Sequence, residues 1–118
     1  MNRIILTFPP SVNHMYCTTK FGRRVIKKAG KEWMATAEQV IALQSPPEPY
    51  ELLKELILHF FWPNLLRSDA SNRLKMVEDA LVAGGLISDD RWSVIPNEIM
   101  RSELDRENPR IEVTWEVS

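Results

Sequence analysis

The sequence has few of the residues that bind soft metal ions or form covalent crosslinks. Its only cysteine is Cys17, and its two histidines, His14 and His59, lie far apart in the chain. One thiol cannot form an internal disulfide, and these three residues do not supply the usual ligands of structural zinc. We therefore expect no disulfide framework and no zinc site, and we expect Cys17 to be an inert thiol.

Long apolar runs and internal repeats are also missing. The longest apolar stretch, residues 56–62, is interrupted by His59 and is far shorter than the roughly 20 residues of a membrane-spanning helix. Residues 1–3 lead directly into a strand-like pattern, without the apolar core and cleavage site of a signal peptide. Because 44% of the 118 residues are hydrophobic, we expect one cytoplasmic domain over residues 1–118, with a modest core and no membrane segment.

An excess of positive charge is absent too, since 15 basic and 16 acidic residues give a net charge of −1. A chain of this charge is not expected to coat DNA indiscriminately, because phosphate contacts need Lys and Arg. The distribution is nevertheless uneven. A basic run without any acid comprises Lys20, Arg23, Arg24, Lys27, Lys28 and Lys31. Such a run is either a solvated face or a surface that holds phosphates, and the sequence leaves both alternatives open.

Alternating apolar and polar residues predict strands over 4–8, 23–27, 56–62, 92–100 and 110–117. The third of these has apolar side chains on both faces, which is typical of a central strand, and the last has one apolar and one polar face. In a central strand, His59 is expected to be a packed or edge-facing residue and not a metal ligand.

Apolar residues at helical spacing predict two main helices. Trp33, Ala37 and Ile41 mark the first, which the proline-rich residues 45–49 end, and the second runs from about residue 71 to 83. Gly84-Gly85 is expected to end the second helix, because glycine accepts the left-handed backbone conformation. Strands and helices interleave, so we predict an α/β (α+β sandwich) domain with a mixed sheet of about four to five strands. Most tryptophans and phenylalanines fall on core positions, so we expect them to pack and not to stack on bases.

Oxygen-bearing side chains flank the second helix. Asp69 precedes it and Asp90 follows it, and the two would share a magnesium ion only if the fold returns the chain. Asn72, Lys75 and Asp79 form a second stripe on the helix, in which Lys75 and Asp79 are spaced to pair. From spacing alone, this stripe is either a solvated face with Ser71 or Asp69 as its N-cap, or part of a site.

Two sets of short motifs stand out. Residues 9–16 read Pro-Pro-Ser-Val-Asn-His-Met-Tyr, and further on the chain has the series Asp69-x-x-Asn72-x-x-Lys75, then Asp79-Ala-Leu, then Gly-x-x-x-Asp89-Asp90. Both sets resemble those of the RusA family, whose members cut four-way (Holliday) DNA junctions with a divalent metal: the first is similar to the family's Pro-Pro-Ser-x-Asn-x-x-Tyr element, and the second to its signature. The resemblance runs from near residue 5 to near residue 100, and the motifs agree in order and spacing.

The resemblance implies roles for these residues. Asp69, Lys75 and Asp90 match the catalytic positions; Asp69, Asp90 and Asp89 would hold Mg²⁺, with Mn²⁺ as an alternative; and Ser71, Asn72 and Asp79 would support them. One departure is Ser71, which stands where the best-known members have a third catalytic carboxylate. Another is Ser68, which replaces the family's arginine before the first aspartate, although Arg67 is adjacent.

The resemblance also implies branched DNA as the partner, in recombination, repair or prophage DNA processing. Two cuts need two sites, so a homodimer is expected. The expected DNA contacts are Lys20, Arg23, Arg24, Lys27, Lys28, Lys31, Arg67 and Arg73. Two other hypotheses remain: a junction-binding protein with little or no catalysis, for which Ser71 argues, and a small interaction module that merely keeps the fold.

Overall fold

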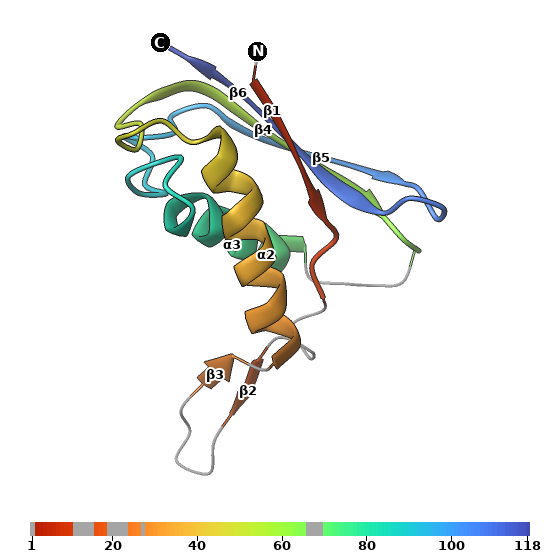
Figure 1. Cartoon of the computed structure of the whole chain (residues 1–118). Coiled ribbons are helices and arrows are strands. Elements are labelled where there is room, and N and C mark those ends of the chain that lie inside the picture. Colours follow the sequence, from red (N-terminus) through yellow and green to blue (C-terminus); the bar gives the residue numbers. More distant parts are fainter. Residues whose placement is uncertain (1, 11–15, 19–23, 27, 66–69) are drawn as a thin grey trace.

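The computed structural model describes residues 2–10, 16–18, 24–26, 28–65 and 70–118, and for 16–18 and 24–26 it describes the backbone. A four-stranded mixed sheet has the order β1-β6-β4-β5, and two helices cover one of its faces (Figure 1). The elements of this layer pair are β1 (Asn2–Thr7), α2 (Lys28–Gln44), β4 (Leu53–Trp62), α3 (Ala70–Ala83), β5 (Glu98–Leu104) and β6 (Arg110–Val117). The predicted α+β domain with a mixed sheet and two main helices is therefore confirmed.

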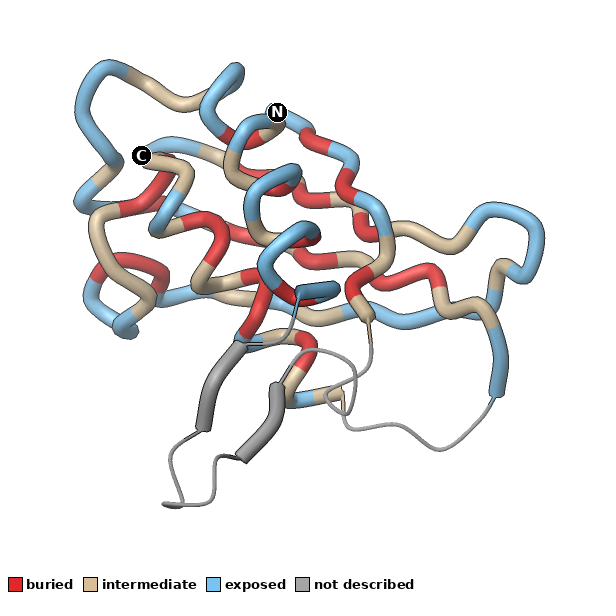
Figure 2. Tube along the Cα trace, turned by 60° about the horizontal axis from the view of Figure 1, so that its bottom comes forward, coloured by how far each residue is buried: buried red, intermediate tan, exposed pale blue. Residues whose placement is uncertain are grey.

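The core lies between the sheet and the helices, and the alternation in the strands produces it. In β6, Ile111, Val113 and Trp115 point to the helices and are at most 1% exposed. The antiparallel register sets Phe60 and Leu58 of β4 opposite Ile111 and Val113, which fills the next row of the same face. Each fully buried large apolar side chain contributes about 2 kcal/mol relative to an exposed one. In Figure 2, buried positions alternate with more exposed ones along the strands of the sheet.

Strand β4 is central, as its two apolar faces predicted, because it pairs with β6 on one side and with β5 on the other. The pairing of β4 with β5 is parallel, so the chain must cross over between them, and α3 forms this crossover. His59 stacks on Phe61 with ring centroids 4.2 Å apart, and its Nε2 lies 2.8 Å from Glu103 Oε1 of β5. The expectation that His59 is a packed residue is confirmed.

Glycines end α3 as expected. The helix stops at Ala83, and Gly85 has φ of +84°, the left-handed conformation that L side chains rarely adopt. Gly84 is needed for a different reason, since a Cβ there would lie 2.7 Å from Ile41 Cγ2 of α2. The chain then turns back along α3, fixed by hydrogen bonds from Leu86 N to Leu81 O (3.0 Å) and from Tyr50 N to Leu86 O (2.9 Å).

The prediction of a strand over residues 92–100 was wrong for residues 92–97. Residues 91–95 form a turn, because the carbonyl of Arg91 accepts hydrogen bonds from Val94 N (3.0 Å) and Ile95 N (3.2 Å). The strand is β5, which starts at Glu98 and continues to Leu104. As an edge strand it is largely exposed, so it lacks the apolar alternation that identified the other strands.

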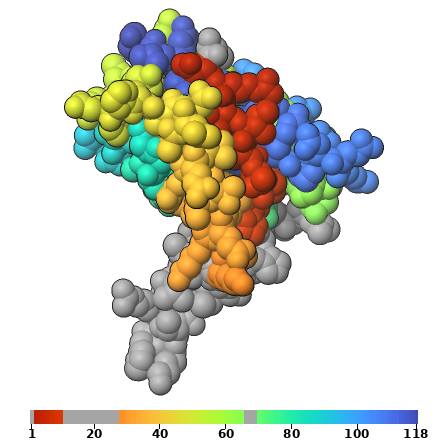
Figure 3. Space-filling view, viewed as in Figure 1, coloured from red at the N-terminus to blue at the C-terminus, as the bar shows by residue number. Residues whose placement is uncertain are grey.

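Helix α2 begins at Lys28 and packs beside β1 (Figure 3). Its buried residues are Gly30, Trp33, Ala37 and Ile41. Before it, β2 (Tyr16–Thr18) and β3 (Arg24–Ile26) form a separate antiparallel pair, and β3 confirms the predicted short strand. Neither described helix combines the length and apolar character that crossing a membrane requires.

Candidate active site on helix α3

Helix α3 presents the second stripe of side chains that its spacing predicted. Lys75 is exposed on this stripe, and its Nζ lies 3.2 Å from Asp79 Oδ1, one helical turn further on. Asn72 is half-buried and Ser71 is exposed in the first turn. Because α3 starts at Ala70, Ser71 is the second residue of the helix and not its cap.

The segment after α3 brings Asp90 to the same stripe. The ammonium of Lys75 donates a hydrogen bond to Asp90 Oδ2, and the two residues are 15 positions apart in the sequence. Asp89 lies next to this contact, and its Oδ1 accepts a hydrogen bond of 2.7 Å from Asp90 N. Three of the residues singled out by the family resemblance, Lys75, Asp79 and Asp90, are thus in one cluster.

The Lys75–Asp90 contact favours the charged forms of both groups. Hydrogen bonding to Lys75 holds the pKa of the Asp90 carboxyl below its ordinary value, and the same bond raises the pKa of Lys75. Asp90 is therefore ionised and Lys75 charged at neutral pH. An ionised carboxylate beside a fixed cation is an arrangement suited to binding a divalent metal and a phosphate.

A pair of glutamates next to this cluster was missed by the sequence reasoning. Burial, followed by a hydrogen bond with Glu98 and the charges of Glu98 and Asp90, raises the pKa of Glu78 to about 8. Burial also raises the pKa of Glu98. In the sequence, the only signal for Glu78 is its position one helical turn from Lys75. Glu98 reaches Glu78 because the parallel pairing of β5 with β4 starts at Glu98.

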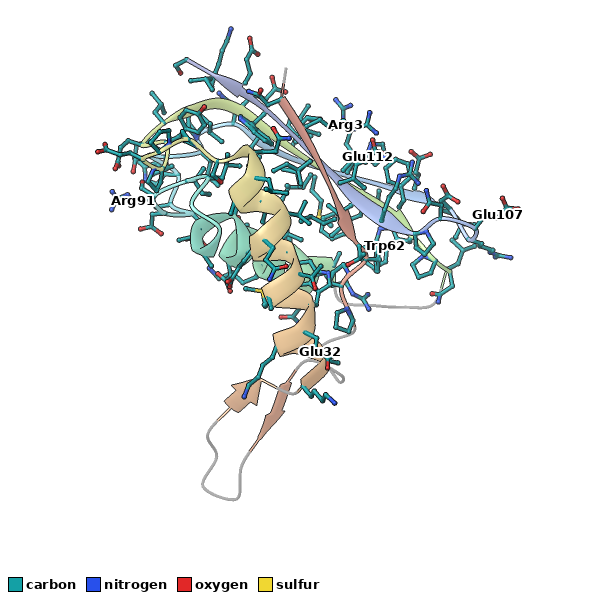
Figure 4. All side chains as sticks on the ribbon, viewed as in Figure 1. Arg3, Glu32, Trp62, Arg91, Glu107 and Glu112 are labelled. Atoms are coloured by element: carbon teal, nitrogen blue, oxygen red, sulfur yellow. The ribbon has the colours of Figure 1, made fainter. Side chains whose placement is uncertain are left out.

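Arg73 lies in the interior of the fold. Its side chain is 9% exposed, and its Cζ is 5.1 Å from the ring centroid of Phe8 and 5.3 Å from that of Trp62. Figure 4 labels Trp62 near the end of β1, where these segments converge. This burial differs from the exposed position that a DNA-backbone contact requires. Arg73 instead links α3 to the segments that precede residues 11–15 and 66–69.

Several expected site residues lie outside the described residues. They are the metal ligand Asp69 and the basic residues Lys20, Arg23, Lys27 and Arg67; for Arg24 only the backbone is described. Of the basic run, Lys28 and Lys31 are described, and both are exposed at the start of α2. Lys28 is 91% exposed and lies 3.8 Å from Glu32 Oε1, so its charge is largely available to a partner.

The described residues alone do not complete a metal site. Within residues 2–10, 28–65 and 70–118, no three His, Cys, Asp or Glu side chains are grouped so that they could hold an ion by themselves. The carboxylates of Asp89 and Asp90 are hard oxygen donors of the type that magnesium prefers. Asp69, the further ligand that the motif implies, falls outside the described part.

Comparison with known proteins agrees with this geometry. The model of the endodeoxyribonuclease RusA family matches residues 7–116, nearly the whole chain. A comparison with curated proteins gave no match. The family match covers both the early proline motif and the α3 signature, the two features on which the resemblance rested. The chain therefore belongs to the RusA family of endodeoxyribonucleases, metal-dependent nucleases that act on Holliday junctions.

Proposed function

We propose that this protein is an active Mg²⁺-dependent nuclease that cuts four-way junctions through Asp69, Asp90 and Lys75. The observation that carries this proposal is the contact between Lys75 and Asp90. Lys75 belongs to the helical part of the family signature and Asp90 to the part that follows the helix. The chain that returns along α3 brings the two residues together. A solvated helix face would not require an aspartate 15 positions away to meet Lys75.

The donor set fits a hard divalent cation. Asp89 and Asp90 offer carboxylate oxygens, which are the hard donors that magnesium prefers. Asp69, directly before α3, is the ligand that would complete the set. A divalent ion held by these carboxylates would supply the Lewis acidity that phosphodiester hydrolysis needs.

Lys75 contributes electrostatic stabilisation in this proposal. The Lys75 side chain is 58% exposed even while its ammonium contacts Asp90 and Asp79, so a phosphate can approach it. A fixed cation beside a phosphate offsets the negative charge that develops in the transition state. Asp79 and Asp90 hold the ammonium in position from two sides, which limits the side-chain entropy lost on binding.

The exposed lysines at the start of α2 supply sequence-independent affinity for the junction arms. Lys28 and Lys31 are part of the basic run, and phosphate contacts of this kind position DNA without reading its sequence. One domain carries one site, whereas resolving a junction takes two cuts. We therefore propose a homodimer, and sedimentation with and without junction DNA measures this directly.

A second candidate function is junction binding without cleavage. Ser71 favours it, because a hydroxyl carries no charge where the best-known members have a carboxylate. The loss of one full negative charge weakens the attraction for a divalent ion. Under this alternative, the basic run and the fold still hold the junction, but the phosphodiester bonds stay intact.

Cleavage of a synthetic four-way junction in Mg²⁺, with a linear duplex of the same arm sequences as the control substrate, separates these functions. The parent should cut the junction and leave the duplex intact, and Asp90→Asn should lower the rate by at least about 100-fold. Asp105→Asn is the matched control variant, since Asp105 also pairs with a cation, Arg110 at 2.9 Å, but lies beyond β5.

The outcomes are distinct. Junction binding in a gel shift without any Mg²⁺-dependent cleavage would favour the second candidate. Equal rates for the parent and Asp90→Asn would remove Asp90 from the site. If the parent neither binds nor cuts the junction, both candidates fail.

A further inference from the structure

Trp92 stands apart from the other tryptophans. Trp33 and Trp115 are 6% and 1% exposed and Trp62 is partly buried, whereas Trp92 is 81% exposed. The expectation that most tryptophans pack in the core holds for Trp33 and Trp115, and Trp92 is the exception. A single exposed apolar residue is common on protein surfaces, so exposure alone carries no function. Trp92 is distinguished by the anchored turn that carries it and by the charged residues that precede it in the sequence.

The turn that carries Trp92 is firmly anchored. The amides of Val94 and Ile95 both donate to the carbonyl of Arg91, and the side chains of Val94 and Ile95 are 1% and 4% exposed in the core. Leu53 N of β4 donates to Val94 O at 2.8 Å, which ties the turn to the central strand. The indole is therefore presented to solvent by a fixed backbone.

In the sequence, Trp92 lies close to a residue of the proposed site. Asp90, which contacts Lys75, precedes Trp92 by two positions on the same short segment. Arg91 lies between them with 62% of its side chain exposed, and its guanidinium lies 3.8 Å from Asp89 Oδ2. Figure 4 shows Arg91 at the outer edge of the molecule, directed away from the sheet.

An exposed indole next to an exposed guanidinium matches the chemistry of an unstacked nucleotide. The indole offers an aromatic face for a base, and the guanidinium offers charge to the adjoining phosphate. In an intact duplex the base faces are covered by their neighbours. At a branch point, stacking is interrupted, so faces of the innermost base pairs become available.

We propose that Trp92 stacks on a base exposed at the branch point of the DNA, beside the phosphate that Lys75 and Asp90 act on, and that Arg91 contacts the flanking phosphate. Trp92 is then a specificity-determining residue, because its contact forms with branched DNA and not with linear duplex. This inference rests on the proposed function for its substrate class. It assigns the recognition of the branch to the turn after Asp90, whereas the basic run recognises only backbone.

The test measures binding and not cleavage, so that it stands apart from the nuclease activity. Dissociation constants of the parent, Trp92→Ala and Trp92→Phe are measured by fluorescence anisotropy, in EDTA, on a four-way junction and on a linear duplex of the same sequence. Trp92→Ala should weaken junction binding by about 10-fold, with little change on the duplex, and Trp92→Phe should keep most of the affinity. Leu43→Ala is the matched control, since Leu43 is 85% exposed on α2 and away from this turn.

A base analogue reports the contact directly. With 2-aminopurine at the branch point, the parent should change the probe's fluorescence on binding, and Trp92→Ala should not. Equal losses on junction and duplex, an unchanged junction affinity, or the same fluorescence change with Trp92→Ala would each overturn the proposal. Dissociation of a dimer by Trp92→Ala in sedimentation would also overturn it, because the indole would then face a second copy of the chain.

These results separate the two proposals. A parent that binds junctions without cutting them still tests Trp92 through binding. A parent that binds neither branched nor linear DNA contradicts the proposed function, and with it the contact assigned to Trp92.

Discussion

Lys75 and Asp90 form an ion pair between the middle of α3 and the segment that returns along it. The pair holds Asp90 ionised, since hydrogen bonding to Lys75 keeps the pKa of this carboxyl low. It also leaves Lys75 beside the place where a metal ligand and a phosphate are proposed to meet. The pair therefore connects, by a direct contact, the helical part of the family signature with the part that follows α3.

Replacing Lys75 by methionine should abolish most cleavage and retain junction binding. The variant keeps the length and apolar stem of the side chain but removes the charge, so we expect the rate to fall by about 100-fold or more. The pKa of Asp90 should rise toward the ordinary value of a carboxylic acid, which an NMR titration measures. Lys54→Met is the control, because Lys54 is similarly exposed at 63% and pairs with Glu116 at 3.6 Å. A parental cleavage rate in Lys75→Met would refute the catalytic role of Lys75.

Glu78 makes stability depend on pH. Burial is the main reason that its pKa is raised from 4.5 to about 8, and the neighbouring acids Glu98 and Asp90 add to the increase. The charge of Lys75 acts in the opposite direction. Between these two pKa values the folded protein keeps a proton that the unfolded chain releases. The contribution of Glu78 to the free energy of unfolding is therefore fully present below about pH 4.5. It is lost as the pH rises through about 8.

The variant Glu78→Gln should flatten that dependence, because an amide does not ionise. Urea unfolding at several pH values between about 5 and 9 compares its slope with that of the parent. Glu107→Gln, at an exposed position, should keep the parental slope. Identical slopes in the parent and Glu78→Gln would show that Glu78 does not retain its proton in the folded protein.

Arg73 should stabilise the packing of α3 against the ends of β1 and β4. Its guanidinium lies over Phe8 and Trp62, and its stem is buried among them. Arg73→Ala removes both the cation–π contacts and the packing, so we expect the free energy of unfolding to fall by about 2 kcal/mol. The control is Arg106→Ala at an exposed site, expected to change stability by less than about 0.5 kcal/mol. Urea unfolding with equal midpoints for the two variants would contradict the structural role.

The basic run should give the protein its salt-dependent affinity. Replacing Lys27, Lys28 and Lys31 together by alanine should weaken binding to every junction sequence alike and flatten the dependence of affinity on salt. A titration across salt concentrations gives the slope for the parent and the triple variant. Should the two slopes coincide, the run is only a solvated face.

Local pattern was enough to predict much of the fold. The alternation of Ile111, Val113 and Trp115 identified β6, and the two apolar faces of residues 56–62 identified the central strand. The glycines at 84 and 85 ended α3 as expected. These features depend on the residues of one segment, so a single sequence contains them. The exposed edge strand β5 has no such pattern, and its start was therefore misplaced.

The site was less predictable because it depends on contacts between distant segments. The spacing of Lys75 and Asp79 predicted their pairing within α3. The approach of Asp90 requires the returning chain, which hydrogen bonds of Leu86 to Leu81 and Tyr50 hold in place. Asp90 stood out as an acid that follows the helix, but spacing does not encode such a return, and only the family resemblance joined Asp90 to Lys75 in one site. The Glu78–Glu98 pair had no counterpart in the motifs and arises from the crossover that begins β5.

Ser71 offers a direct test of how many carboxylates the site uses. If the site works with fewer carboxylates than the best-known members have, its metal affinity should be weak, because each lost carboxylate removes a full charge facing a divalent ion. Ser71→Asp should then lower the Mg²⁺ concentration needed for half-maximal cleavage. The folding cost should be small, since Ser71 is exposed in the first turn of α3, where an acidic side chain interacts favourably with the helix dipole. If Asp89 or Asp79 already completes the site, the added charge repels phosphate and cleavage falls instead. Titrating Mg²⁺ against cleavage rate for both proteins decides between these, and an unchanged or higher requirement would show that residue 71 does not face the metal.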